Sequence, residues 1–404
     1  MKRRILFYSH DTFGLGHFRR SLTIASYLSR HIDGLSILML TGLDSAASFE
    51  ALAGVDFVKL PSISKSGPDQ YHTRHLRVSF HRVRRIRENL ILTVAKAFDP
   101  SLVVVDNVPR GAEGELLPTL RWLRSHRPGV RLVLTLRDVL DAPEKIVPQW
   151  RELGVYGALQ RFYDEIWVAG SQPIFDPIAL YEFPPAIAQR VKFCGHVVRS
   201  TRPEDADAVG RELRLGSAPL VVVSCGGGGD GYPLISAYID AAEPLVREGL
   251  HSAVFLGPDM PSVQRRELKQ RLLPLSDHVH TYDFRPDLVS FLRLASVSVS
   301  MAGYNTVCEL VTMRKPAVVV PRAYPRIEQV LRAEAFAARG LLRLVRPEEL
   351  NPITLRREIE ALLRAPAPDG GGALPEGIDF AGLGRIARRV RKHLGLTDSA
   401  GGAE

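Results

Sequence analysis

The chain is predicted to fold as an α/β protein with two doubly wound, mainly parallel sheets. Short apolar runs alternate with longer amphipathic runs along both halves of the chain, which is the rhythm of repeated βαβ units. The apolar runs are nearly continuous in Val, Ile and Leu, as expected for parallel strands that are buried on both faces. At 404 residues the chain is too long for one ordinary core, so each half is expected to form its own domain.

The first half contains a series of apolar runs that are expected to be strands. The first run leads through a glycine-containing turn into an amphipathic stretch, residues 18–30, that favours a helix. Asp106 ends one run and Arg137 directly follows another. Because the carboxyl ends of parallel strands line the ligand site of an open sheet, both are candidates for substrate contact, and a structural role is equally open. The strand-like runs are residues 5–9, 36–40, 102–106, 132–136 and 166–169.

The second half repeats this pattern. Its helical stretches are residues 233–247, 305–313 and 327–339, and each lies after an apolar run. Connections of this kind join parallel strands. The strand-like runs are residues 220–224, 253–256, 279–282, 297–300 and 317–321.

Domain boundaries are expected where this rhythm stops. A polar stretch begins at Ser200, so residues 1–199 are expected to form the first domain and residues 200–365 the second. Residues 366–404 are expected to be a linker rich in Pro and Gly, one more amphipathic helix at 379–394, and a small polar tail.

The formal net charge of +9 indicates an anionic partner, such as nucleic acid, acidic lipid or a phosphorylated substrate. No interleaving of basic and aromatic residues is visible, so nucleic acid is not expected. Two segments concentrate the charge, and each is either a solvated helix face or an anion-binding surface. The first holds Arg74, Arg77, Arg82, Arg84, Arg85 and Arg87 with His72, His75 and His81, and the second holds Arg385, Arg388, Arg389, Arg391 and Lys392.

Targeting signals are weak in this chain. No window approaches the run of about 20 apolar residues that a membrane-spanning helix needs, and the apolar run behind the basic start is shorter than that of a signal peptide. We therefore expect a cytoplasmic protein, with a peripheral position on the inner membrane face left open by the basic segments. Three isolated cysteines, Cys194, Cys225 and Cys308, favour neither a disulfide framework nor a zinc site.

The most informative stretch runs from Ser300 to Glu309. It follows an apolar run and opens a helical one, and its small residues allow a ligand to approach the backbone. The N–H groups and positive dipole end of the helix then favour a phosphate, and Glu309 lies one to two turns further in, where it can reach a ribose. The candidate ligand contacts in this stretch are Ala302, Gly303, Asn305, Thr306 and Glu309.

Two further glycine-containing turns lie between a strand and a helix. The first turn holds Gly14, Gly16 and His17. The second holds Gly226, Gly227 and Gly228 in a run of four glycines before Asp230. The second turn can present backbone N–H groups to a diphosphate, and Asp230 can instead cap the following helix.

The pattern S-x-A-G-x-x-T-x-x-E at residues 300–309 resembles the nucleotide-sugar signature of GT-B glycosyltransferases, especially the family that adds N-acetylglucosamine to the lipid-linked muramoyl-pentapeptide precursor. Other stretches carry the resemblance in the same order along the chain. Residues 226–231 resemble the family's G-G-S-x-G-A turn, and residues 315–321 its K-P-x-x-x-x-P element. Glu328 and Gln329 resemble its D/E-x-Q or H-Q element. Residues 195–199, which end in Arg199, resemble its G-x-P-V-R strand end, with Val197 in place of Pro.

The resemblance implies two Rossmann-like domains that face each other across a cleft. It implies a UDP-linked sugar donor held by the C-terminal domain, an acceptor hydroxyl held by the N-terminal domain, and transfer with inversion that needs neither a cofactor nor a metal. By resemblance the first turn, with Gly14 and Gly16, binds the acceptor, and Arg137 is a further acceptor-side candidate. By resemblance His17 is the base, with His10 and Asp106 as alternatives, and His17 can instead cap its helix.

For the donor, the resemblance implies that Glu309 binds the ribose and that Glu328 and Gln329 bind the sugar. Phe284 and Arg285 would lie against the uracil base, in a turn that can equally be an ordinary connection. Two other functions stay open. One is a nucleotide-sugar hydrolase or 2-epimerase of the same fold, and the other is a non-enzymatic protein that binds nucleic acid.

Overall fold

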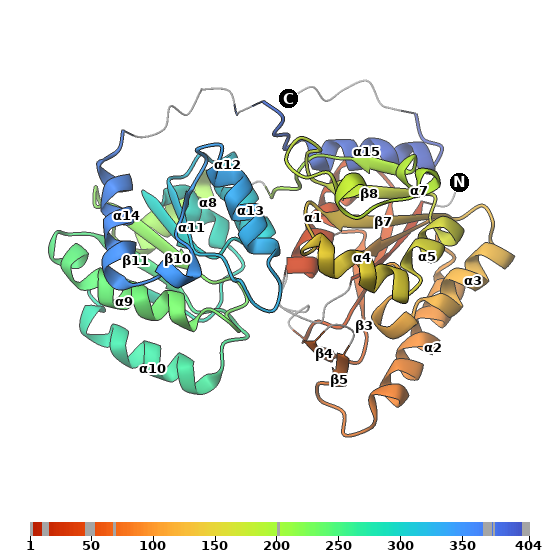
Figure 1. Cartoon of the computed structure of the whole chain (residues 1–404), viewed down its shortest axis with the longest axis horizontal. Helices are drawn as coiled ribbons and strands as arrows, with labels where there is room; N and C mark the ends of the chain where they lie inside the picture. The colour runs from red at the N-terminus through yellow and green to blue at the C-terminus, as the bar shows by residue number, and fades with distance from the viewer. Residues whose placement is uncertain are drawn as a thin grey trace. The chain divides into compact units, whose positions relative to one another are not determined.

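The computed structural model describes residues 3–9, 16–44, 53–67, 70–199, 203–366, 374 and 376–397. It divides into two compact units, which are coloured along the chain in Figure 1. Unit 1 combines Met1–Val197 with Gly377–Glu404, and unit 2 is Val198–Glu376.

Unit 1 is built on a sheet of seven strands in the order β3-β2-β1-β6-β7-β8-β9, and all neighbouring pairs are parallel. The expected strands are present, and β3 and β9 are additions that the sequence did not reveal. A separate antiparallel hairpin, β4 (Ile63–Gly67) and β5 (Gln70–Thr73), lies outside this sheet. The sheet strands are β1 (Arg4–Tyr8), β2 (Ser36–Thr41), β3 (Val55–Lys59), β6 (Leu102–Asp106), β7 (Arg131–Arg137), β8 (Glu165–Ala169) and β9 (Val191–Phe193).

Several helices of unit 1 have one buried apolar face. In α1, for example, Phe18, Ile24, Ala25 and Leu28 are buried, at the spacing of a single helix face. The helices are α1 (Gly16–His31), α2 (Phe80–Phe98), α3 (Leu117–His126), α4 (Pro143–Glu152), α5 (Val155–Phe162), α6 (Pro177–Leu180), α7 (Pro185–Ala188) and α15 (Gly382–His393), with a 3₁₀ turn η2 at Ala112–Gly114.

The last helix, α15, packs on unit 1 although it follows unit 2 in the chain. It contacts α1, and the Nη1 atom of Arg389 lies 3.0 Å from a carboxylate oxygen of Glu165 in β8. In Figure 1 this helix, drawn in blue, lies over the strands of unit 1. The sequence suggested a separate segment for residues 366–404. It did not place the helix of this segment on unit 1, because burial against a distant part of the chain leaves no local signal.

Unit 2 is built on six strands in the order β12-β11-β10-β13-β14-β15, again all parallel. Among the described strands of unit 2, only the two-residue strand β15 was not predicted from the sequence. The strands are β10 (Leu220–Ser224), β11 (His251–Phe255), β12 (Val279–Tyr282), β13 (Val297–Ser300), β14 (Ala317–Val319) and β15 (Arg343–Leu344).

The helices of unit 2 include one where the sequence suggested a linker. Residues 200–207 were expected to be a polar connection, but α8 spans Pro203–Glu212 and buries Ala206 and Val209. The other helices are α9 (Tyr232–Arg247), α10 (Ser262–Leu272), α11 (Leu288–Leu294), α12 (Tyr304–Thr312), α13 (Glu328–Ala337) and α14 (Pro352–Arg364), with 3₁₀ turns η3 (Leu273–Leu275) and η4 (Pro347–Glu349). No helix in the described part of the chain is both long and apolar enough to cross a membrane.

The basic segment of residues 72–87 is not uniformly a surface feature. Arg87 is buried and donates from Nε and Nη2 to the two carboxylate oxygens of Glu115, at 2.6 Å each. The Tyr8 hydroxyl donates to the same carboxylate at 2.6 Å, and Arg87 also reaches the Pro61 carbonyl at 2.7 Å. Arg87 therefore ties α2 to β1 and to the start of α3, and it is not available to bind an anion.

Replacing Glu115 with Ala should destabilise unit 1 by about 3–5 kcal/mol, because the Arg87 guanidinium would stay buried without its counter-charge. Urea unfolding followed by tryptophan fluorescence is the measurement. All three tryptophans, Trp122, Trp150 and Trp167, lie in unit 1, so the signal reports on this unit.

The matched control is Arg131→Ala, which breaks a pair with Asp164 (3.3 Å) in the same unit at a half-exposed position. It should cost at most about 1 kcal/mol. Equal losses for the two variants would contradict a special role for the buried pair.

Candidate functional site

Each sheet has a point where the strand order reverses. In unit 1, β1 lies between β2 and β6, and in unit 2, β10 lies between β11 and β13. Ligands of open α/β sheets bind beyond the carboxyl ends of the strands at such a point. The predicted residues gather at both points. In unit 1, His17 follows β1 and Asp106 ends β6. In unit 2, one glycine-containing turn, with Gly226, Gly227 and Gly228, follows β10, and the other, with Ala302 and Gly303, follows β13.

His17, Asp106 and Arg20 form one polar cluster in unit 1. The Nδ1 atom of His17 lies 2.6 Å from Oδ2 of Asp106, and Arg20 donates from Nη2 to the other carboxylate oxygen. Asp106 and Arg20 are almost fully buried. Burial alone would raise the pKa of Asp106, but the charge of Arg20 and the hydrogen bonds from His17 and Arg20 hold it well below its usual range.

This geometry fixes the tautomer of His17. An ionised carboxylate only accepts hydrogen bonds, so Nδ1 must carry the proton and donate to Asp106. Nε2 then keeps its lone pair. Burial, and then the positive charge of Arg137, lower the pKa of His17 to about 4, against the opposing effect of Asp106. The imidazole is therefore neutral at neutral pH and can accept a proton at Nε2.

The acceptor-side predictions fall on the same edge of the sheet. Gly16 is the first residue of α1, and a Cβ atom added there would lie 3.1 Å from Nη2 of Arg137. A side chain at this position would meet that guanidinium, so Gly16 and Arg137 lie close together. Gly14 and His10 lie outside the described residues.

The two turns of unit 2 lie side by side. Ser224 and Ser300 are register partners in β10 and β13, and the amide of Met301 donates to the Ser224 carbonyl at 3.3 Å. The turn after β10 packs tightly on the chain after β11, because a Cβ atom at Gly228 (φ +91°) would overlap the backbone of Leu256. A Cβ atom at Gly226 meets no atom within 4 Å, so this glycine faces open space.

The second turn opens helix α12. Gly303 is its N-cap and supplies no side-chain cap, and Asn305 and Thr306 lie in the first turn of the helix. Arg332, which is buried in α13, donates to the Ala302 carbonyl at 3.0 Å and lies over the ring of Tyr304. The backbone at Ala302 is thus held from inside the unit, and the helix N-terminus is left to accept an anion.

Glu309 is buried and paired with Arg199. The Nη2 atom of Arg199 lies 3.0 Å from Oε1 of Glu309, and Arg199 also donates to the Pro286 carbonyl at 3.3 Å. Both residues line a hollow of about 500 Å³ together with Arg293 and Lys315. A ribose that bonds to Glu309 would therefore share this carboxylate with Arg199.

Asp230, Arg322 and Glu328 form a third network. Arg322 donates from Nη1 to Asp230 at 3.1 Å and from Nη2 to Glu328. The amide of Arg322 donates to Oε1 of Gln329 at 3.1 Å. The positive charge of Arg322 thus offsets negative charge beside the glycine turn. Arg322 also positions Glu328 and Gln329.

Phe284 and Arg285 follow β12, the edge strand two places from β10. The Arg285 side chain is held by Asp287 at 2.6 and 2.9 Å and by Glu212 at 2.7 and 3.0 Å, and it lies over the ring of Phe291. Because two carboxylates already hold the guanidinium, contact with a base would come from the backbone of this turn.

Three arginines were not singled out as site residues from the sequence, namely Arg20, Arg322 and Arg332. Each orients a predicted residue: Arg20 holds Asp106, Arg322 holds Glu328 and Gln329, and Arg332 holds Ala302. A signal existed for Arg20, which lies three residues after His17 on the same helix face. In the residues that the structure covers, no group of three or more His, Cys, Asp or Glu side chains is arranged to hold a metal ion.

Comparison with known proteins finds a family match in the second half of the chain. Residues 222–368 match the glycosyltransferase family 28 C-terminal domain. A curated relative from an Exiguobacterium species is 28% identical over 172 residues, which are 42% of this chain and 45% of the relative. It is named UDP-N-acetylglucosamine–N-acetylmuramyl-(pentapeptide) pyrophosphoryl-undecaprenol N-acetylglucosamine transferase. The match therefore spans less than half the length of that relative.

Solved structures extend the similarity to the whole chain at the level of the fold. MurG of Acinetobacter baumannii has a TM-score of 0.56 at 13% identity, with 96% of this chain and 99% of that chain covered. A Listeria monocytogenes protein assigned as a UDP-N-acetylglucosamine 2-epimerase has a TM-score of 0.64 at 16% identity, with 98% of each chain covered. The predicted fold class is confirmed. Residues 222–368 thus match the glycosyltransferase family 28 C-terminal domain, in a chain that has the GT-B fold.

Proposed function

We propose that the protein is a glycosyltransferase that moves a sugar from a UDP-linked donor to an acceptor hydroxyl with inversion. The observation that carries this proposal is the family 28 match over the unit that holds both glycine-containing turns and Glu309. The neutral, oriented imidazole of His17 in unit 1 supports it independently, because transfer to a hydroxyl needs a base.

The donor would bind at the strand reversal of unit 2. The turn of Gly226, Gly227 and Gly228 and the start of α12 would hold the diphosphate through backbone N–H groups and the helix dipole. Glu309, shared with Arg199, would bind the ribose. Glu328 and Gln329, held by Arg322, would bind the sugar, and the turn of residues 284–285 would lie against the base.

In the reaction, Nε2 of His17 would take the proton of the acceptor hydroxyl. The acceptor oxygen would then form a bond to the anomeric carbon while the bond to the diphosphate oxygen breaks and UDP leaves with the electron pair. Asp106 would stabilise the imidazolium that forms, and the N-terminus of α12 would stabilise the charge on the leaving diphosphate. No step in this scheme requires a metal ion or a cofactor.

A panel of UDP- and dTDP-sugars tests the function directly. The donor that raises the melting temperature is incubated with the protein, with and without lipid-linked and phosphorylated acceptors, and the products are separated by mass. A sugar–acceptor product supports the proposal. Free sugar or a 2-epimer formed without acceptor would instead assign the hydrolase or epimerase function.

His17→Ala should lower turnover on the acceptor by about 10²–10⁴-fold, because the general base is lost. UDP affinity should stay within about twofold, since His17 lies in unit 1 and the UDP contacts lie in unit 2. Steady-state kinetics and calorimetry measure the two quantities.

The pH profile separates a base from a structural role. The acid limb of kcat/KM for the unaltered protein should lie near pH 4, the pKa of His17. Arg137→Gln removes a positive charge that lowers this pKa, so it should move the limb to higher pH. Arg121→Gln, an exposed change in the same unit, should leave the limb in place. Wild-type turnover in His17→Ala would transfer the role to Asp106 or His10.

Glu309→Ala should weaken UDP binding by about 1.5–3 kcal/mol, the range for a hydrogen bond to a charged group. Calorimetric titration with UDP measures the loss. Glu334→Ala on α13 is the control, because it removes an exposed carboxylate that pairs with Arg346. A folded Glu309→Ala protein with unchanged UDP affinity would show that Glu309 serves Arg199 alone.

The basic segment at residues 72–86 would dock an anionic or lipid-linked acceptor at an acidic membrane surface. Arg82 and Arg85 on α2 are exposed, and Leu76 (46% exposed) and Val78 (40% exposed) lie just before this helix. Cations beside exposed apolar side chains suit the boundary between head groups and acyl chains.

Arg82→Ala combined with Arg85→Ala should weaken binding to acidic vesicles by roughly 2 kcal/mol, at about 1 kcal/mol per basic residue. Sedimentation with phosphatidylglycerol vesicles measures this, and added salt should reduce the binding. Arg121→Ala with Lys145→Ala removes the same charge from exposed sites elsewhere in unit 1 and should have little effect. No binding to acidic vesicles by the unaltered protein would contradict membrane docking.

A further inference from the structure

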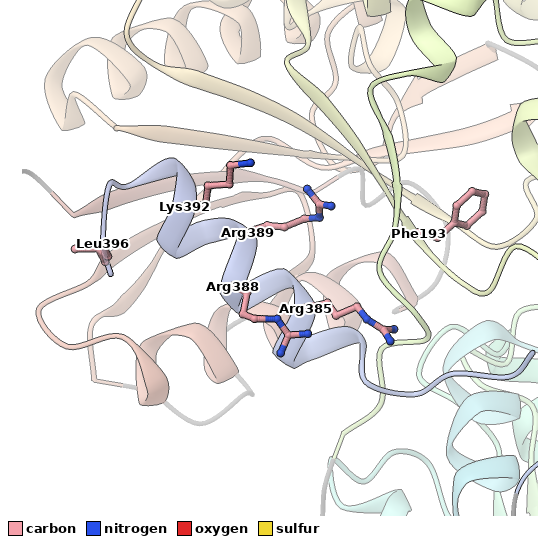
Figure 2. A pocket seen from close by; sticks show the side chains of 6 residues that line it. All are labelled: Phe193, Arg385, Arg388, Arg389, Lys392 and Leu396. Carbon is pink, nitrogen blue, oxygen red and sulfur yellow. The ribbon is translucent and has the colours of Figure 1, made fainter. Parts of the chain in front are cut away.

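A second hollow lies in unit 1 along one face of α15. Its volume is about 630 Å³. Figure 2 shows the side chains of Arg385, Arg389 and Lys392 extending from this helix toward the segment that carries Phe193. Four of its six lining residues are cations and none is an acid. They are Phe193, Arg385, Arg388, Arg389, Lys392 and Leu396, and this set is called the α15 groove below.

The cations share one face because of their spacing. Positions 385, 388, 389 and 392 recur at intervals of three and four residues, which places their side chains in a single stripe of the helix. The opposite face buries Ile386, Val390 and Leu394. That apolar face holds the helix on unit 1, so packing does not require the basic stripe.

Among the described residues, two of the four cations have counter-charges. Arg385 pairs with Asp379, and Arg389 pairs with Glu165 at 3.0 Å. The side chains of Arg388 and Lys392 make no hydrogen bond or ion pair with any residue in the described part of the chain. Like charges four residues apart repel each other on a helix, so this pair is unfavourable without a ligand.

We propose that the α15 groove binds a small ligand that carries two or more phosphate groups. At a rise of about 1.5 Å per residue, the stripe from Arg385 to Lys392 spans about 10 Å, enough for a chain of two or three phosphates. Guanidinium groups match phosphate oxygens with paired hydrogen bonds. Phe193 and Leu396 add apolar surface for the rest of such a ligand. This site lies in unit 1 and is additional to the donor site proposed in unit 2.

Titration calorimetry of the full chain with inorganic tripolyphosphate tests the proposal. The double variant Arg388→Ala/Lys392→Ala should bind at least tenfold more weakly than the unaltered protein. Neither side chain supports the described fold through a hydrogen bond or ion pair, so the variant should fold. Fluorescence of Trp167, whose ring stacks on His393 of α15, reports whether the helix is still in place.

The control is Arg357→Ala/Arg364→Ala on α14, which makes the same change in net charge at two exposed positions. It should keep the original tripolyphosphate affinity, and Arg388→Lys/Lys392→Arg should keep most of it. Equal affinities of the two alanine double variants would overturn the proposal. So would a loss of phosphatidylglycerol-vesicle binding by Arg388→Ala/Lys392→Ala with unchanged tripolyphosphate affinity, because that result assigns the groove to a lipid surface.

Discussion

The reversal of strand order beside β1 in unit 1 and beside β10 in unit 2 is the constraint on which the rest of the structure depends. At a reversal, the connections on either side leave in opposite directions and the ends of two neighbouring strands stay uncovered. In unit 1 this brings His17 and Asp106 within hydrogen-bonding distance, although 89 residues separate them. In unit 2 it brings the turns after Ser224 and Ser300 together.

Buried ion pairs then orient what the sheets bring together. Asp106 is held between His17 and Arg20, Glu309 is held by Arg199, and Glu328 is held by Arg322. Each of these candidate carboxylates is thereby paired with an arginine in a poorly hydrated place, where an unpaired charge would be costly. For His17 the consequence is chemical, since an ionised Asp106 fixes the proton on Nδ1 and leaves Nε2 as the basic atom.

The glycines after β10 serve two purposes that one sequence pattern does not separate. Gly228 is required by close packing on Leu256, and its φ of +91° favours glycine for a second reason. Gly226 faces open space, and there the absence of a side chain leaves the backbone accessible. A run of four glycines thus combines a structural need with a candidate phosphate site.

By itself the sequence determined the two parallel sheets, most of their strands and the order of the candidate motifs, because apolar runs and helical periodicity are local properties. It also located His17 and Asp106 as candidates at the ends of those elements, and Glu309 as a candidate within the helix after residue 303. It did not reveal β3, β9 or the placement of α15 in unit 1, which depend on contacts between distant residues. Tertiary structure alone decided that Arg87 is buried against Glu115, while Arg388 and Lys392 have no described partner. It also decided that Arg20, Arg322 and Arg332 orient candidate site residues. All are basic residues in amphipathic or polar stretches, and only the fold decides which of them meets a carboxylate, a carbonyl or solvent.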